Sequence, residues 1–152
     1  MSFLAPYPEL VTCIVSWLAS SILKIPIYLM MHRKLNIMLA FGTGGMPSSH
    51  AATMTGTTLA IGLFSGFDNP AFAIAVAISM IVIYDAAGVR REAGYHAEAL
   101  NRLLDDWFLI TKVPQAEQKK YKEMLGHTPV EVVGGVLTGL VTALVMWLIW
   151  PK

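Results

Sequence analysis

Long apolar runs separated by short turns dominate this chain. From Leu35 to Tyr84, fifty residues carry one formal charge, Asp68, and the nineteen residues from Val132 to Trp150 carry none. A helix needs about 20 apolar residues to cross the roughly 30 Å hydrocarbon core of a bilayer. Turn residues and prolines suited to the first helical turn divide these runs into four predicted transmembrane helices, at residues 8–31, 47–67, 70–89 and 129–150.

The one long polar stretch, residues 90–127, begins with the pattern of an amphipathic helix. Glu98 and Arg102 form an i,i+4 pair on one face of that helix, and apolar residues recur at helical spacing on another. A helix of this kind lies in the membrane interface or packs under the bundle. The sequence therefore predicts an all-α integral membrane helical bundle. It forms a single membrane domain over residues 1–152, with about four transmembrane helices plus an amphipathic interfacial helix.

Composition supports a membrane protein and excludes two other classes. Of the 152 residues 55% are hydrophobic and 14% are charged, against roughly 25% charged in an ordinary globular domain, which excludes a soluble domain. A net charge of +1 provides no basic field for nucleic acid, so no nucleic-acid partner is expected. Cys13 is the only cysteine, which leaves no internal disulfide and no cysteine zinc site.

The distribution of lysine and arginine predicts the orientation in the cell membrane. With four crossings, nine of these residues lie on one side and only Lys152 on the other, while Lys24 falls inside the first helix. The nine are Arg33, Lys34, Arg90, Arg91, Arg102, Lys112, Lys119, Lys120 and Lys122. By the positive-inside rule, the side with the polar stretch faces the cytoplasm and both termini lie outside.

A glycine-rich segment, GTGGMPSSH at residues 42–50, leads into the second helix on the cytoplasmic side. Its glycines, Gly45 among them, allow the backbone to approach a ligand, and a helix N-terminus favours an anion such as phosphate. One interpretation is an ordinary helix cap made by Ser48 or Ser49. The glycines and the histidine at the helix start, His50, favour a functional site.

Two further groups of polar residues lie at the same membrane edge. Asp85 lies about one turn before the end of the third helix, and Arg90 and Arg91 follow that helix. The two arginines are either membrane anchors with Asp85 as counter-ion or a guanidinium fork for phosphate oxygens. His127 and Glu131, four residues apart at the start of the fourth helix, share one face. They are either a solvated pair or a carboxylate that fixes an imidazole tautomer for catalysis.

Together these residues indicate phosphoryl transfer. A nucleophilic histidine attacks phosphorus, a second histidine protonates the leaving alkoxide, and arginine with backbone N–H groups holds the equatorial oxygens. No metal cage is evident in the sequence, so neither a metal nor another cofactor is expected.

Three motifs carry a family resemblance that covers about residues 24–139. Pro47-Ser48-Ser49-His50 resembles the Pro-Ser-Gly-His motif of the type-2 phosphatidic acid phosphatase superfamily, and His127-x-x-x-Glu131 resembles its His-x-x-x-Asp motif. The strings GTGGMPSSHAA, YDAAGVRREAG and LGHTPVEVVGG resemble its divergent branch, the acid phosphatase/vanadium-dependent haloperoxidase-related proteins. Serine replaces a motif glycine, glutamate replaces aspartate, and the arginines lie 36 or 37 residues before His127 instead of six.

The resemblance assigns roles to individual residues. It implies His127 as the nucleophile that forms a phosphohistidine, Glu131 as its orienting residue and His50 as the general acid. Phosphate oxygens would be bound by Ser48, Ser49, backbone N–H groups, Arg90 or Arg91, and Lys24. Vanadate would act only as a mimic of the transition state.

The leading hypothesis is therefore a membrane phosphatase that acts on a lipid phosphate or isoprenoid (pyro)phosphate at the cytoplasmic leaflet. The alternative is a non-catalytic membrane protein that binds phospholipid or another anion and retains the phosphate cradle, as the altered motifs suggest. A transporter or channel is less favoured, because the polar residues gather at one face. Gly135 and Gly139 have the spacing of a helix-packing pair, and a homo-oligomer is possible through this face.

Overall fold

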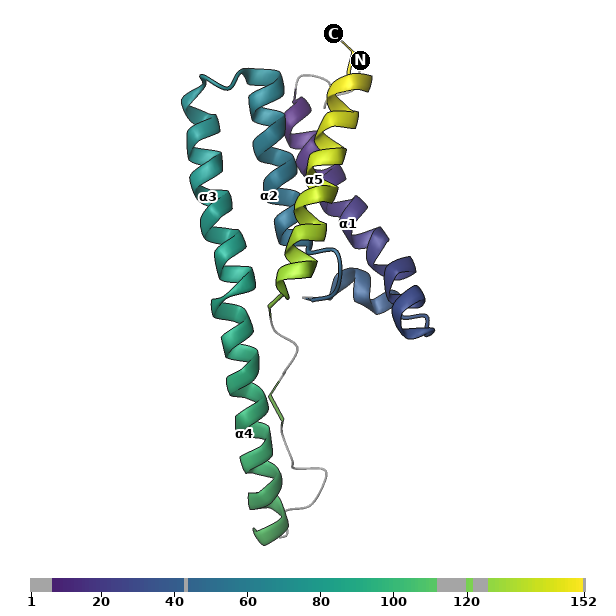
Figure 1. Cartoon of the computed structure of the whole chain (residues 1–152), viewed down its shortest axis with the longest axis vertical. Coiled ribbons are helices and arrows are strands. Elements are labelled where there is room, and N and C mark those ends of the chain that lie inside the picture. Colours follow the sequence, from purple (N-terminus) through teal and green to yellow (C-terminus); the bar gives the residue numbers. More distant parts are fainter. Residues whose placement is uncertain (1–6, 43, 112–119, 122–125, 152) are drawn as a thin grey trace.

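The computed structural model describes residues 7–42, 44–111, 120–121 and 126–151, and within them every regular element is helical. The elements are α1 (Pro8–His32), a 3₁₀ turn η1 (Ile37–Phe41), α2 (Ser49–Ala60), a π-helical turn η2 (Ile61–Ser65), α3 (Pro70–Ala87), α4 (Val89–Thr111) and α5 (Pro129–Ile149). The predicted all-α bundle is confirmed (Figure 1). Part of the polar stretch predicted at residues 90–127 lies outside the described residues.

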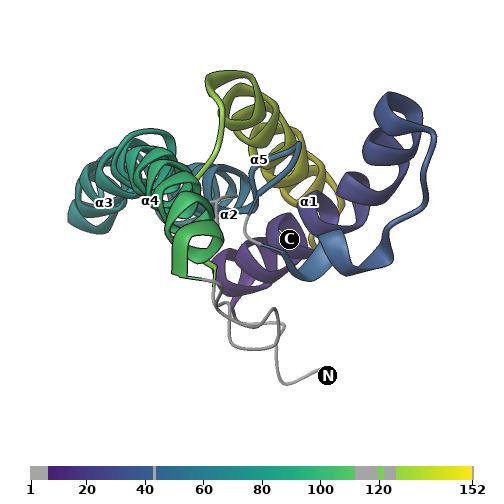
Figure 2. The same cartoon turned by 90° about the horizontal axis from the view of Figure 1, so that it is seen from below.

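The helices form an up-and-down bundle around α2. Figure 1 shows the chain running down along α1, up along α2, down along α3 and up along α5, so that α1 begins and α5 ends at the same end of the bundle. α2 packs against α5, α1 and α3, whereas α3 has α2 as its main partner (Figure 2). The loop before α2 and the start of α5 therefore meet at the other end of the bundle.

Three helices among the described residues are long and apolar enough to cross a membrane: Pro8–His32, the continuous helical stretch Pro70–Phe108, and Pro129–Ile149. Their outer faces expose large apolar side chains, such as Ile22 (62% exposed), Met80 (68%) and Leu148 (71%), as expected of surfaces that face lipid. The second helix, predicted at residues 47–67, is shorter. Its helical part, residues 49–65, spans about 26 Å at 1.5 Å per residue and is not one of these three.

Small residues set the spacing of the helices around α2. A Cβ added at Gly139 would lie 2.4 Å from the Ala52 carbonyl oxygen, and one at Gly135 would lie 2.4 Å from that of Ser48. The predicted packing pair on α5 therefore does pack, but against α2 of the same chain. Because α2 occupies this face, Gly135 and Gly139 are not free to contact a second copy.

The amphipathic helix differs from its prediction in orientation. One residue, Gly88, separates α4 from α3, and α4 continues along nearly the same direction, end to end with α3 in Figure 1 and over it in Figure 2. Gly88 marks the junction and its N–H still donates to the Tyr84 carbonyl at 2.8 Å, so helical hydrogen bonding carries through the break. α4 therefore projects away from the bundle and does not lie across it.

Candidate functional site

His127 is held rigidly at the lower end of the bundle, between α3 and α5. Its backbone N–H donates to the Ala86 carbonyl at 2.8 Å, and its side chain is 2% exposed. The ring Nδ1 lies 3.3 Å from Glu131 Oε2, as the i,i+4 spacing predicted. This contact leaves Nε2 as the ring nitrogen available for chemistry.

Glu131 is fixed in turn by the capping box that starts α5. Its Oε2 accepts the Thr128 N–H at 3.0 Å, and its own N–H donates to Thr128 Oγ1 at 3.3 Å. The Glu131 carbonyl accepts the Ser48 N–H at 2.9 Å, which ties the start of α5 to the start of α2. The capping box at the start of α5 thus fixes the Glu131 carboxylate, and this carboxylate in turn orients His127.

His50, in the first turn of α2, meets His127 edge to face, with 5.7 Å between the ring centroids. His50 Nδ1 is buried and has no hydrogen-bond partner among the described residues. Buried polar atoms nearly always have a partner, so this nitrogen indicates a place where a ligand or water belongs. The structure thus brings together two histidines that are 77 positions apart in the sequence.

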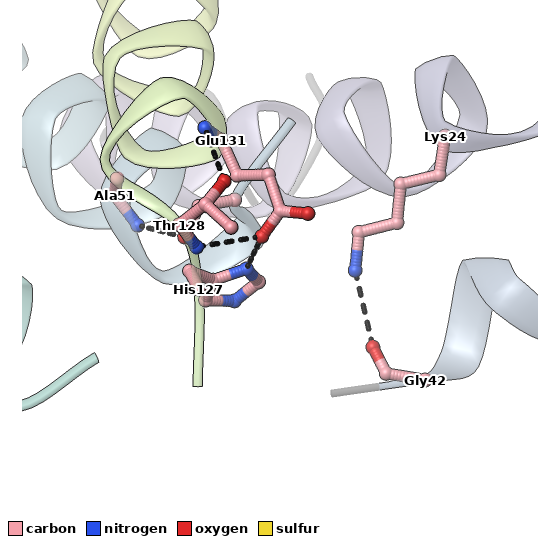
Figure 3. Close-up of polar contacts among 7 residues, drawn as sticks. Lys24, Gly42, Ala51, His127, Thr128 and Glu131 are labelled. Atoms are coloured by element: carbon pink, nitrogen blue, oxygen red, sulfur yellow. Dashed lines mark hydrogen bonds and ion pairs between the residues drawn. The ribbon is translucent and has the colours of Figure 1, made fainter. Parts of the chain in front are cut away.

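The two histidines line a cavity of about 410 Å³ that also holds Lys24. Lys24 is 1% exposed, and its ammonium donates to the Gly42 carbonyl at 3.1 Å. In Figure 3, Glu131 lies between His127 and Lys24, and its second carboxylate oxygen points toward the ammonium. The rest of the lining is largely apolar and includes Trp17, Met54 and Val82.

The two serines of the predicted anion site have different surroundings. Ser48 is buried and caps α2 by accepting the Ala51 N–H at 3.3 Å, and it lines neither of the cavities at His127. Ser49 lines the larger cavity, and its buried hydroxyl has no hydrogen-bond partner among the described residues. The helix-cap interpretation therefore applies to Ser48, and Ser49 is left as the hydroxyl available to a ligand.

The two arginines, Arg90 and Arg91, also have different partners. Arg90 forms an ion pair with Asp85 and is half exposed, which is the anchor and counter-ion arrangement. Arg91 lies against the Tyr95 ring, 5.5 Å from its centroid, and lines a second cavity of about 250 Å³. Neither arginine lines the larger cavity, so Lys24 is the cation that shares it with both histidines.

The smaller cavity lies on the other side of His127. His127 and Glu131 line it together with Arg91, Gly45 and Gly126. Gly45 and Gly126 have φ of 80° and 78°, where side chains are disfavoured. A Cβ at Gly126 would lie 2.5 Å from the Arg91 nitrogen, so this glycine allows the chain before α5 to pass close against the start of α4.

The sequence analysis missed the Ala86 carbonyl and the apolar wall at Trp17, and it used Lys24 only through the family resemblance, although the chain carries a pattern that points to this lysine. Thr12, Ser16, Ser20 and Lys24 follow one another every four residues on α1 and are all buried, so a stripe of small polar residues leads to the lysine. The role of the Ala86 carbonyl and the apolar wall at Trp17 left no such pattern. No cluster of three or more histidine, cysteine, aspartate or glutamate side chains suited to a metal occurs in the described ranges.

Comparison with known proteins gives a consistent result. A family model described as "Divergent PAP2 family" matches residues 7–142. A protein of Bacillus subtilis (strain 168), described as the uncharacterized membrane protein YuiD, is 38% identical over 154 residues, which cover 96% of this chain and 97% of that protein. No solved structure matches the chain significantly.

Proposed function

The chain belongs to the divergent PAP2 family, and from this membership and the geometry of the site we propose that it is a membrane phosphatase. Its substrate is a lipid phosphate or isoprenoid (pyro)phosphate, which it hydrolyses through a phosphohistidine intermediate. The observation that carries the proposal is the buried His127, held at Nδ1 by Glu131 and in contact with His50, beside a cavity that contains the Lys24 ammonium.

In the first step His127 Nε2 attacks phosphorus. The N–P bond forms as the P–O bond to the leaving group breaks, and His50 gives its proton to the departing oxygen. Glu131 stabilises the positive charge that develops on the His127 ring. In the second step His50 takes a proton from water, the water oxygen attacks phosphorus, and the N–P bond breaks to release phosphate and free His127.

Groups on the larger cavity hold the phosphoryl oxygens. The Lys24 ammonium supplies the positive charge, and the Ser49 hydroxyl and the first N–H groups of α2 supply hydrogen-bond donors. Trp17, Met54 and Val82 offer an apolar surface to the hydrocarbon part of the substrate. Arg91, in the smaller cavity, is the arginine better placed near His127, since Arg90 is paired with Asp85. These residues need no metal or other cofactor for the two steps.

A second candidate function rests on the same cradle. The departures from the family motifs and the unpaired His50 Nδ1 and Ser49 hydroxyl also suit a membrane protein that binds phospholipid or another anion without turnover. Such a protein requires the cation and the donors, but it does not require a nucleophile. Labelling of the protein by the phosphoryl group distinguishes the two functions.

We further propose that the site faces the cytoplasm and that both termini lie outside the cell. The uneven distribution of lysine and arginine supports this orientation. Figure 1 shows the start of α1 and the end of α5 at the opposite end of the bundle from the starts of α2 and α5, which carry His50 and Glu131.

The test is phosphate release by the purified protein in detergent from a panel of lipid phosphates, with His127→Ala and His32→Ala compared. His32 is the control because it stacks on Tyr28, 4.3 Å between centroids, and lines neither cavity at His127. We expect release that resists EDTA, is inhibited by vanadate and is lost in His127→Ala but kept in His32→Ala. EDTA-sensitive release would contradict the histidine mechanism, and equal activity of both variants would refute the role of His127.

A further inference from the structure

α4 has an apolar stripe that the described part of the chain leaves exposed. Its residues follow one another at alternating intervals of four and three, the heptad spacing of a coiled-coil seam. We call these seven exposed residues, six of them apolar and one a histidine, the α4 stripe: Val89, Ala93, His96, Leu100, Leu103, Trp107 and Ile110. Leu103 is 66% exposed and Ile110 is 76% exposed, so large apolar side chains stand at its far end.

A different face of α4 makes the contacts within the chain. Ala97 and Asn101 are buried, and the Asn101 amide forms two hydrogen bonds with the backbone of Tyr121, each 2.8 Å long. Asp105 on the same face pairs with Lys120 at 2.7 Å. Ala97 and Asn101 each lie one position after a residue of the α4 stripe, which is about 100° around the helix. The stripe is therefore separate from the surface already used.

The position of α4 indicates that lipid tails do not cover this stripe. α3 has 18 residues and a length of about 27 Å at 1.5 Å per residue, close to the roughly 30 Å thickness of the hydrocarbon core. Because α4 continues along the direction of α3, it extends beyond the hydrocarbon when α3 crosses it (Figure 1). An apolar stripe in water requires a protein partner.

The charges of α4 also disfavour the membrane surface as the partner. α4 carries four acidic and three basic side chains, but two of the basic ones, Arg90 and Arg91, lie in its first turn next to the bundle, so that beyond this turn Arg102 is the one basic residue of the helix. Helices that lie on membranes usually carry lysine and arginine on their polar face, because the headgroups are often anionic. The excess of acidic residues favours an apolar protein surface over a lipid surface.

We propose that two copies of this chain pair through the α4 stripe as a parallel coiled coil. Two copies inserted in one membrane with the same orientation hold their α4 helices parallel, so each stripe residue meets its own counterpart. The flanking pairs in this register are Glu92 against Ala97, Ala99 against Leu104 and Asp106 against Thr111 of the other copy, and none sets like charges together. In this register the apolar residues of the stripe face their own counterparts, and no formal charges of the same sign lie side by side across the flanking positions.

Disulfide cross-linking in lipid vesicles tests this pairing. Leu103→Cys places a thiol in the stripe, and Arg102→Cys, next to it but outside the stripe, is the matched control, because the Arg102 side chain is 78% exposed. Both variants carry Cys13→Ser, so that the introduced cysteine is the one thiol of each chain. Copper phenanthroline with oxygen accepts the two electrons released when two thiols form a disulfide. We expect at least about tenfold more cross-linked dimer from Leu103→Cys than from Arg102→Cys.

Equal cross-linking of the two variants, or monomer from both, would overturn the proposal. If the thiol at residue 103 does not cross-link, and a fluorophore attached to it is quenched by a lipid-soluble quencher, then α4 lies on the membrane and the proposal is wrong. Energy transfer between labelled copies provides a second measurement, and we expect Leu103→Asp to reduce it at least about tenfold. Because Leu103 is exposed in the single chain, this variant retains the helical content of the unsubstituted protein.

Discussion

Replacing Gly135 by alanine tests the link between helix packing and the site without touching any group that does chemistry. The added Cβ would lie 2.4 Å from the Ser48 carbonyl oxygen and 2.8 Å from the Ala51 Cβ. The neighbouring Gly134→Ala is the matched control. There the added Cβ meets the flexible end of Met46 at 3.0 Å, and that methyl group can move.

The size of the expected effect follows from these distances. Relieving a 2.4 Å contact to the 3.5 Å of normal packing requires α2 and α5 to move apart by about 1 Å. Overpacking of this kind costs about 1–3 kcal/mol of stability, whereas the control gains roughly 0.5–1 kcal/mol from alanine in a helix. Because α2 carries His50 and α5 carries Glu131, the same shift displaces one histidine from the other, and a 1 Å misplacement lowers a rate by about 10²-fold.

Two measurements check this prediction. Thermal unfolding in detergent compares the stability of Gly135→Ala and Gly134→Ala, and phosphate release compares their activity. We expect Gly135→Ala to be less stable and about 10²-fold less active, and Gly134→Ala to match the unsubstituted protein or exceed its stability. Equal stability and activity of the two variants would refute the close packing of α2 on α5 as the feature that positions the site.

Three further predictions concern the site and its orientation. Lys24→Met replaces a buried charge with a side chain of similar length, so the fold should persist while phosphate release falls by about 10²-fold, and unchanged release would exclude Lys24 from phosphate binding. Glu131→Gln keeps an acceptor for the Thr128 N–H but removes the charge beside His127, so kcat should fall by at least about 10²-fold, and an unaltered kcat would contradict an orienting role. In a Cys13→Ser chain on intact cells, an impermeant maleimide should label Asp68→Cys and leave Arg102→Cys unlabelled, whereas the reverse pattern would invert the proposed topology.

The long helices were the most predictable part of the structure. Long, largely apolar runs and prolines in the first turn placed α1, α3 and α5 within two residues of their observed ends. An apolar run indicates that a segment is surrounded by nonpolar groups, but it does not indicate the angle between one helix and the next. Gly88 can end a helix or let it continue, so the sequence did not predict that α4 extends α3.

The sequence predicted most of the residues that belong to the site, but it did not predict which of them lie together. The His127–Glu131 contact follows from their i,i+4 spacing, and that spacing was visible in the sequence. The separation of Arg90 and Arg91 was not, because neighbouring helical residues point about 100° apart and the rotation of α4 decides which one reaches a cavity. Lys24 entered the prediction only through the family resemblance, since its burial depends on packing against α2 and α5.

Trapping of the phosphohistidine tests the central claim most directly. The protein in detergent is mixed with a ³²P-labelled lipid phosphate and quenched within milliseconds in alkali, in which phosphohistidine survives, and the labelled peptide is identified. The account predicts a label on His127 that forms and decays at the rate of turnover and is absent in His127→Ala. A label on any other residue, or phosphate release with no labelled protein, would contradict it. Lipid binding without label or release would favour the anion-binding function.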